Sequence, residues 1–202
     1  MEPAAFTPVA IPEGQHRLQS QYCLWYSRRS PGKQNHNFDQ NLKLIGRFGS
    51  CEQFWSLYSH LVKPGDLASH SDFHLFKMGI KPMWEDEANK FGGKWIVRLR
   101  KGNHNQIWYI EQETTIDPNI AGLASRCWEN LVLAMLGEQF MVGEEVCGAV
   151  VSVRFQEDIL SIWNRTALDP AVTARIRDTF KRVLNLPPAT LIEYKAHNDS
   201  IK

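Results

Sequence analysis

The chain has 202 residues, a formal net charge of +1 and an apolar content of 43%. This length suits one domain, or at most two, and the composition excludes the disordered, fibrous and membrane-spanning classes. A charge near zero argues against a broad coating of nucleic acid, which needs many phosphate contacts, but it is compatible with a small basic pocket for one nucleotide.

The N-terminal quarter predicts an arm, two strands and a loop. Residues 1–15 are rich in Pro and Ala without a period, which indicates a flexible arm before a single domain over residues 16–202. Alternating apolar residues predict strands over residues 20–29 and 41–48. The intervening residues 30–40 form a polar loop whose one aromatic residue is Phe38.

A helix is predicted over residues 50–62, where Ser50 and Gln53 form a capping box. Its buried stripe has the spacing i, i+3, i+4, i+7 and comprises Phe54, Leu57, Tyr58 and Leu61. A second apolar strip, about 60–100° round the helix from that stripe, comprises Cys51, Trp55 and Val62. We expect this strip at the edge of the buried face.

The remaining elements alternate between strands and two further helices. Strands are predicted over residues 73–78, 94–100, 146–155, 159–165 and 191–195. Helices are predicted over residues 125–140 and from Asp169-Pro170 onward, an N-cap followed by Pro at the first helical position. Residues 102–122 are too long for an ordinary connection and are expected to form an inserted loop. Because strands outnumber helices and often follow one another, we expect an α+β fold with an antiparallel sheet and helices on one face.

The four cysteines indicate a reducing environment. Cys23, Cys51, Cys127 and Cys147 show no CxxC spacing, and each lies in an apolar-patterned segment. We therefore expect buried free thiols and a cytoplasmic location.

The segment KPMWEDEANKFGGKW, residues 81–95, places Trp84 directly before Glu85. Trp offers a flat ring for stacking, and a carboxylate accepts two parallel N–H bonds of the kind that the Watson–Crick edge of guanine donates. A cationic ring such as N7-methylguanine would use both residues, since a cation over Trp gains about 0.5–2 kcal/mol. Taken alone, the two residues fit better a core tryptophan beside a solvated acid.

Other polar groups carry weaker signals. The motif HSDFH at residues 70–74 offers metal ligands without supporting partners, and solvated side chains are favoured there. Glu85, Asp86 and Glu87 fit a solvated turn, and no P-loop, GxSxG motif or catalytic Cys/His spacing occurs, so no enzyme is expected. Arg154 ends an apolar strand, where its guanidinium could bind phosphate.

Several segments together resemble the translation initiation factor 4E family, from residue 16 to residue 202. They are FWSLYSHL (54–61), GIKPMWEDEANKFGGKW (79–95), WENLVLAMLGEQF (128–140), VCGAVVSVRF (146–155), SIWN (161–164) and LNLPPATLIEYKAH (184–197). Within the family, YSRRSPG (26–32) and GEQFMVGEEVCGAVVSVRFQEDI (137–159) resemble the 4E-homologous type 2 subclass, which is linked to translational repression.

The resemblance implies a curved antiparallel sheet with three long helices on its convex face and a slot for the mRNA 5′ cap on its concave face. The methylguanine would stack between Trp84 and Phe38, where the general factor has a second Trp, so a lower cap affinity is implied. Glu85 matches the carboxylate for the guanine edge, and its backbone N–H would hold the guanine carbonyl. Trp163 matches the residue of the methyl pocket.

Phosphate binding and partner binding are implied as well. Arg154 matches a phosphate-binding Arg, and Arg98 is the candidate replacement for a family Lys whose place is taken by Ile159. Trp55, with Cys51 and Val62, matches the convex surface that binds YxxxxLΦ motifs. The usual His-Pro-Leu is His16-Arg17-Leu18 here, so part of the first partner contact differs from the family pattern.

The resulting hypothesis is a monomeric cap-binding repressor that needs no cofactor or metal and binds no membrane. It would bind capped mRNA, compete with the general cap-binding factor, and recruit repressor partners of the 4E-binding-protein or GYF-domain type. Binding to the initiation scaffold 4G would be weak or absent. The alternative is an interaction adaptor with little or no cap affinity, and a cap-hydrolysing enzyme would need a carboxylate–metal cage that the sequence does not show.

Overall fold

The computed structural model describes residues 6–29, 38–101, 122–187 and 189–197. The predicted inserted loop at 102–122 therefore falls almost wholly outside the described residues, as do residues 1–5 of the arm.

Seven strands form one sheet in the order β2-β1-β3-β5-β6-β4-β7, and every neighbouring pair is antiparallel. The strands are β1 (Arg17–Arg28), β2 (Leu42–Ser50), β3 (Ser71–Lys77), β4 (Gly93–Arg100), β5 (Val146–Val153), β6 (Glu157–Asn164) and β7 (Ile192–Ala196). The helices are α1 (Phe38–Asn41), α2 (Cys51–Tyr58), α3 (Leu123–Leu136) and α4 (Pro170–Leu184), with 3-10 turns at Pro64–Asp66 and Gly143–Glu145. The curved sheet and mixed α+β fold agree with the sequence-based expectation.

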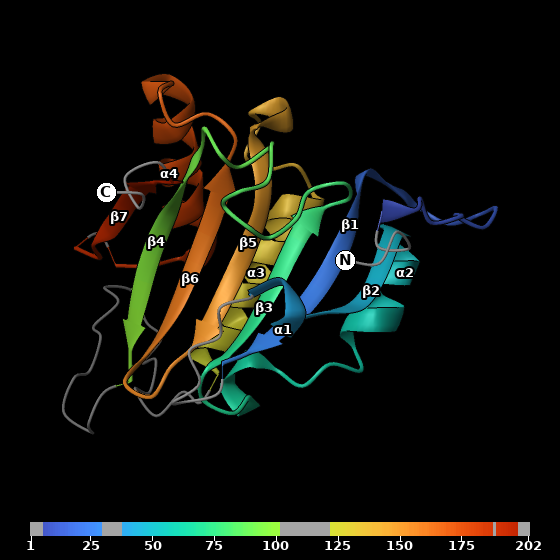
Figure 1. Cartoon of the computed structure of the whole chain (residues 1–202), viewed down its shortest axis with the longest axis horizontal. Coiled ribbons are helices and arrows are strands. Elements are labelled where there is room, and N and C mark those ends of the chain that lie inside the picture. The colour runs from blue at the N-terminus through green and yellow to red at the C-terminus, as the bar shows by residue number, and fades with distance from the viewer. Residues whose placement is uncertain (1–5, 30–37, 102–121, 188, 198–202) are drawn as a thin grey trace.

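Helices α3 and α4 pack on one face of the sheet, behind the strands in Figure 1, whereas the short helix α1 lies in front of the strands. Alternation along the strands produces this division. One cross-strand row faces the helices and belongs to the main core: Leu75, Ala149 and Ile162. The next row along the same strands lies on the open face: His74, Val150, Ser161 and Ile96.

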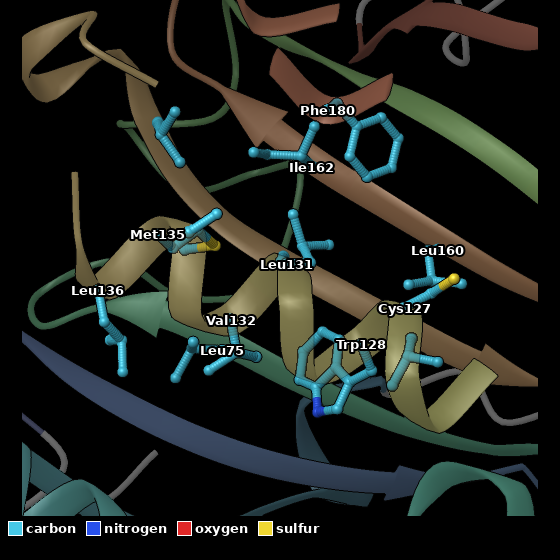
Figure 2. Close-up of a cluster of buried hydrophobic side chains, with 14 of the residues drawn as sticks. Leu75, Cys127, Trp128, Leu131, Val132, Met135, Leu136, Leu160, Ile162 and Phe180 are labelled. Atoms are coloured by element: carbon cyan, nitrogen blue, oxygen red, sulfur yellow. The ribbon is translucent and has the colours of Figure 1, made fainter. Parts of the chain in front are cut away.

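Helix α3 contributes the central part of the main core (Figure 2). Its predicted stripe is fully buried and comprises Trp128, Leu131, Val132 and Met135. Phe180 and Ile176 of α4 complete the same cluster from the other helix. Burial of side chains of this size stabilises the fold by about 1.5–3 kcal/mol each. Packing against α3 and α4 therefore stabilises the sheet.

Helix α2 begins as predicted and ends earlier. Ser50 caps it by accepting a hydrogen bond from the backbone N–H of Gln53 at 3.1 Å, but the helix ends at Tyr58. Residues 59–61 continue as a turn, in which the N–H of Leu61 bonds to the carbonyl of Tyr58. Lys63, the residue before Pro64, is extended, so the chain has left the helical conformation by that point.

The predicted flexible arm is attached to the domain over residues 6–15. Gln21 exchanges two hydrogen bonds with the backbone of Val9, at 2.8 and 3.1 Å, and Arg47 donates to the carbonyl of Thr7 at 2.6 Å. A side-chain amide on α2, that of Gln53, donates to the carbonyl of Ala10 at 2.9 Å. These bonds come from long-range polar side chains, which a local composition argument does not detect.

Three of the four cysteines are buried free thiols, as predicted, and Cys51 is not. It lies exposed at the start of α2. Among the described residues, no helix is long and apolar enough to cross a membrane.

Candidate functional site

A cleft of about 480 Å³ opens on the sheet face opposite α3 and α4. Its floor is built from three cross-strand rows, each contributed by neighbouring strands. The rows are Asp72, Ser152, Ile159 and Arg98; His74, Val150, Ser161 and Ile96; and Trp163, Lys94 and Lys195. Pro82, Met83, Trp84 and Glu85 line the cleft from the loop between β3 and β4, and Arg29 and Arg154 line it from strand ends.

The β3–β4 loop is held rigidly by two polar side chains. The Asp86 carboxylate accepts hydrogen bonds from the backbone N–H groups of Lys81 and Ala88, at 3.0 and 2.9 Å. The buried amide of Asn89 donates to the carbonyls of Lys81 and Met83, both at 2.8 Å. The loop is thus ordered by its own side chains, and sequence reasoning, which treated Asp86 as part of a solvated run, missed both residues.

This bonding presents Trp84 and Glu85 at the mouth of the cleft. Trp84 is 42% exposed, so it does not fill the core, and Glu85 is also exposed. Within the described part of the chain, neither the carboxylate nor the backbone N–H of Glu85 has a hydrogen-bond partner. A stacking ring and an unsatisfied acceptor pair therefore lie side by side on one fixed loop.

Gly92 ends this loop where β4 begins against β6. A Cβ added at Gly92 would lie 1.8 Å from the carbonyl oxygen of Asn164, so no other residue fits there without a shift of backbone. The carbonyl of Gly92 also accepts a hydrogen bond from the N–H of His197 at 3.0 Å. This close approach ties the loop to β6 and to the end of β7.

Trp163 forms the inner wall of the cleft below the loop. It is almost fully buried, and its indole N–H donates to the Ser161 hydroxyl at 3.2 Å. Phe76 packs edge-on against it with 5.4 Å between ring centroids, and His197 packs at 4.4 Å. Phe76 and His197 therefore hold the Trp163 ring in place. The pKa of His197 is lowered to about 4, mainly by burial and to a smaller extent by the positive charge of Lys94.

Arg154 follows β5 directly and points into the cleft with its guanidinium already paired. Its Nη2 lies 2.7 Å from Oδ1 of Asp72, and its Nη1 donates to the carbonyl of Val153 at 2.9 Å. The Asp72 carboxylate thus orients the cation. Asp72 and His74 were expected to be solvated, and that expectation is wrong, because both are buried on the floor.

His74 supports the same corner of the cleft. Its Nε2 lies 2.9 Å from the hydroxyl of Ser27, and burial lowers its pKa to about 4 although nearby Asp72 acts in the opposite direction. The imidazole is therefore neutral near pH 7. Among the described residues, no group of three or more His, Cys, Asp or Glu side chains is arranged to hold a metal ion.

Arg98 lies directly opposite Ile159 in the β4–β6 ladder, so it occupies the same cross-strand row from the neighbouring strand. Its Nη1 pairs with Oε1 of Glu157 at 2.7 Å, and the side chain remains partly exposed. The role of Arg98 as the replacement for a family Lys at the place of Ile159 stays a prediction. Arg100, two residues further along β4, is exposed and does not line the cleft.

Three cationic residues of the cleft were missed by sequence reasoning, namely Arg29, Lys94 and Lys195. With Arg98 and Arg154 they make five cations against the carboxylates of Asp72 and Glu85 among the described lining residues. The net charge of the chain hides this excess, which appears only when β1, β4, β5 and β7 are brought together. The cleft is therefore suited to an anionic ligand with a flat ring.

The predicted second stacking residue, Phe38, begins the short helix α1, and its side chain lies outside the described residues. The predicted position therefore remains a prediction.

The predicted partner surface lies on the other side of the molecule, on α2 and the turn after it. Trp55 is 46% exposed, Val62 is 55% exposed, and Cys51 is exposed as well. The Trp55 ring rests against the rings of Phe54 and Tyr58, with centroids 4.9 and 6.0 Å away. A large apolar ring held in place but left uncovered is typical of a protein contact site.

His16 is fixed beside this surface. Its ring Nδ1 lies 2.7 Å from Oε1 of Glu52, and its carbonyl accepts a hydrogen bond from the N–H of Cys51 at 2.9 Å. The start of the domain is thereby attached to the first turn of α2.

Comparison with known proteins identifies a family. The profile described as Eukaryotic initiation factor 4E matches residues 17–202. Eukaryotic translation initiation factor 4E-4 of Caenorhabditis elegans is 42% identical over 201 residues, covering 99% of this chain and 85% of the relative. Eukaryotic translation initiation factor NCBP of Oryza sativa is 43% identical over 189 residues, covering 94% and 74%.

Solved structures agree in fold. The complex of C. elegans eIF4E-3 with the 4E-binding protein Mextli and a cap analog has a TM-score of 0.77 at 36% identity, covering 93% of this chain and 95% of that one. Ascaris suum eIF4E-3 with the m7G cap has a TM-score of 0.78 at 38% identity, covering 91% and 92%.

Proposed function

The chain belongs to the eukaryotic initiation factor 4E family, and we propose that it binds the 7-methylguanosine 5′ cap of mRNA and represses translation. The observation that carries the cap-binding proposal is the pair Trp84 and Glu85, displayed on a rigid loop at the mouth of a basic cleft. The related A. suum protein was solved with the m7G cap, and the related C. elegans protein with a cap analog and Mextli.

Each part of the cap has a matching chemical group. The Trp84 ring stacks on the cationic methylguanine, and the Glu85 carboxylate accepts the two N–H groups of the guanine edge while its backbone N–H donates to the carbonyl oxygen. Trp163 contacts the methyl group from the inner wall. The phosphates are bound by the guanidinium groups of Arg154, which directly follows β5, and Arg98, which lies on β4.

The acids that hold these arginines set the strength of phosphate binding. Both guanidinium groups already pair with carboxylates at 2.7 Å, so bound phosphate has to share or displace those bonds. With Phe38 as a smaller second stacking ring, a modest cap affinity follows. This is the observation that favours the alternative function, an adaptor with little cap affinity.

Repression follows from occupying the cap without assembling the initiation machinery. In the proposal, Trp55 with Cys51 and Val62 binds YxxxxLΦ motifs of repressor partners, of the 4E-binding-protein or GYF-domain type, and binds the scaffold 4G weakly. The protein acts as a cytoplasmic monomer and as a binding protein rather than an enzyme. The altered His16-Arg17-Leu18 segment, fixed beside α2, supports a partner preference different from that of the general factor.

A first experiment uses methylguanine resin and the variant Glu85→Gln. The wild type should be retained and eluted by methylated but not unmodified guanosine triphosphate. The variant should bind about tenfold more weakly, because an amide N–H opposes a guanine N–H and such a mismatch costs about 1–3 kcal/mol. Glu87→Gln, an exposed acid of the same loop outside the cleft, should leave retention unchanged.

Two outcomes would count against this function. Failure of the folded wild type to bind the resin would favour the adaptor. Equal affinity for methylated adenine and methylated guanine caps would remove the Glu85 carboxylate from ligand recognition.

A further inference from the structure

Arg17 lies at the edge of the proposed partner surface on α2. It is the first residue of β1, it is exposed, and its direct cross-strand partner is Ser50, the N-cap of α2. The residue before it, His16, accepts a hydrogen bond on its carbonyl from the backbone N–H of Cys51 at 2.9 Å. Arg17 therefore directly follows the residue that binds the start of the partner surface.

The backbone of Arg17 is fixed on both sides. Before it, the Ser50 hydroxyl donates to Oε1 of Gln15 at 2.6 Å, and the His16 ring bonds to Glu52. After it, Leu18 packs against the main core. Because the chain is held at both neighbours, the Arg17 side chain starts from a fixed point beside the first turn of α2.

The acid in that turn does not balance the charge of Arg17. Both carboxylate oxygens of Glu52 already bond to His16, at 2.7 Å from its ring Nδ1 and 3.0 Å from its backbone N–H. The pKa of Glu52 is lowered, mainly by the hydrogen bond to His16, so the carboxylate is charged near pH 7. Among the described residues, Arg17 forms no ion pair with any carboxylate.

This cation borders an apolar surface that is left uncovered. Trp55 lies one helical turn beyond Cys51, about 6 Å along the axis of α2, and is 46% exposed. An exposed arginine alone is ordinary. Arginine and tryptophan together, however, are among the residues most enriched at the positions that dominate protein contacts. A partner that covers Trp55 and Cys51 comes within the neighbourhood of Arg17.

We infer that Arg17 is a specificity-determining residue that selects partner peptides with an acidic residue next to the segment that covers Trp55. This inference rests on the proposed binding of YxxxxLΦ motifs by α2. A carboxylate is the anion that a peptide offers, and a guanidinium binds it through two parallel N–H bonds. A charge at the rim of a contact mainly accelerates association and discriminates between partners.

The experiment is a double-mutant cycle on binding kinetics, with the full chain and synthetic YxxxxLΦ peptides. One peptide carries a glutamate directly before the motif, a second carries it directly after the motif, and a third is neutral at both places. The protein variants are Arg17→Gln and Arg17→Glu. Arg28→Glu is the matched control, because Arg28 is an exposed arginine at the other end of β1. Thermal unfolding checks that each variant is folded.

We expect Arg17→Gln to weaken binding of one of the two acidic peptides by about threefold to fivefold, the size of an exposed ion pair, and to leave the neutral peptide unchanged. The loss should appear mainly in the association rate and should diminish at high salt. Arg17→Glu should bind that peptide more weakly still, and a lysine in place of its glutamate should restore binding. Arg28→Glu should bind all three peptides as the wild type does.

Other results would overturn the inference. An equal loss for acidic and neutral peptides would show that Arg17 contributes packing and not charge selection. No loss for either acidic peptide, while Trp55→Ala still abolishes binding, would remove Arg17 from partner selection and leave the partner surface intact. Failure of the folded wild type to bind any of the peptides would overturn both the inference and the partner surface on which it rests.

Discussion

At the scale of single residues, some side chains of the cleft could be identified from the sequence and others could not. Trp84 and Glu85 are adjacent in the chain, so their possible shared chemistry was visible locally, but the two residues alone fitted a core tryptophan better and only the family resemblance favoured the ligand site. The structure corrects the local reading, because Trp84 is 42% exposed. Asp72 and His74 could not be placed, because alternation along β3 assigns them to one face without showing that this face is also buried. The resulting neutral His74 has a measurable consequence.

We predict that His74 makes the folded protein less stable at acid pH. Its pKa is about 4 in the folded protein, against about 6.5 for an ordinary histidine. Between these values the unfolded chain binds more protons, so the free energy of unfolding rises with pH across this window and is highest above it. The contribution of His74 is at most about 3 kcal/mol.

Urea unfolding at several pH values between 4 and 7 measures this effect. His74→Gln should flatten the pH dependence, while His60→Gln, at an exposed histidine just after α2, should not. Part of the slope will remain, since burial also lowers the pKa of His197 to about 4. An unchanged slope in His74→Gln would show that this imidazole is not buried and neutral.

At the scale of elements, hydrophobic periodicity predicted the strands and the long helices because each has one clear apolar face. The ends were harder, as α2 shows, since its stripe continues to Leu61 while the helix ends at Tyr58. The β3–β4 loop has no hydrophobic periodicity, and a sequence pattern therefore does not predict its conformation. The buried amide of Asn89 orders the loop through hydrogen bonds that composition does not reveal.

Asn89→Ala should loosen the loop and weaken cap binding. The substitution leaves the carbonyls of Lys81 and Met83 without their donor; because both bonds are part-buried, the cost is at most about 1–3 kcal/mol for each carbonyl. Differential scanning calorimetry should show a lower midpoint, and cap affinity should decrease more than the fraction of unfolded protein explains. Lys90→Gln, in the same loop, provides the control. Undiminished cap affinity in folded Asn89→Ala would show that this amide does not position Trp84.

Helix α2 should carry partner binding independently of the cleft. Trp55→Ala removes an exposed ring that anchors the proposed peptide contact, so binding of a YxxxxLΦ peptide should decrease by at least 2 kcal/mol, a factor of about thirty. Cap binding and thermal stability should remain close to wild type, because the ring is 46% exposed. Combined loss of stability and cap binding in Trp55→Ala would identify Trp55 as a core residue.

At the scale of the whole molecule, the sheet separates the cleft from the proposed partner surface on α2. The open face gathers Arg29, Lys94, Arg98, Arg154 and Lys195 into one cleft. A net charge of +1 gives no sign of this concentration. The cluster depends on strand order, in particular on β7 pairing with β4, and the sequence reading left that order open.

The most direct test of the account is an equilibrium titration of the full chain with methylated and unmethylated guanosine triphosphate, followed by tryptophan fluorescence. The account predicts saturable quenching by the methylated ligand and an affinity that exceeds that of the unmethylated ligand by up to about thirtyfold, because methylation makes the ring stacked on Trp84 cationic. Trp84→Ala should abolish both the quenching and the difference. Equal affinities for the two ligands, or no binding by a wild type that still binds the partner peptide, would contradict the assignment of the cleft to the cap.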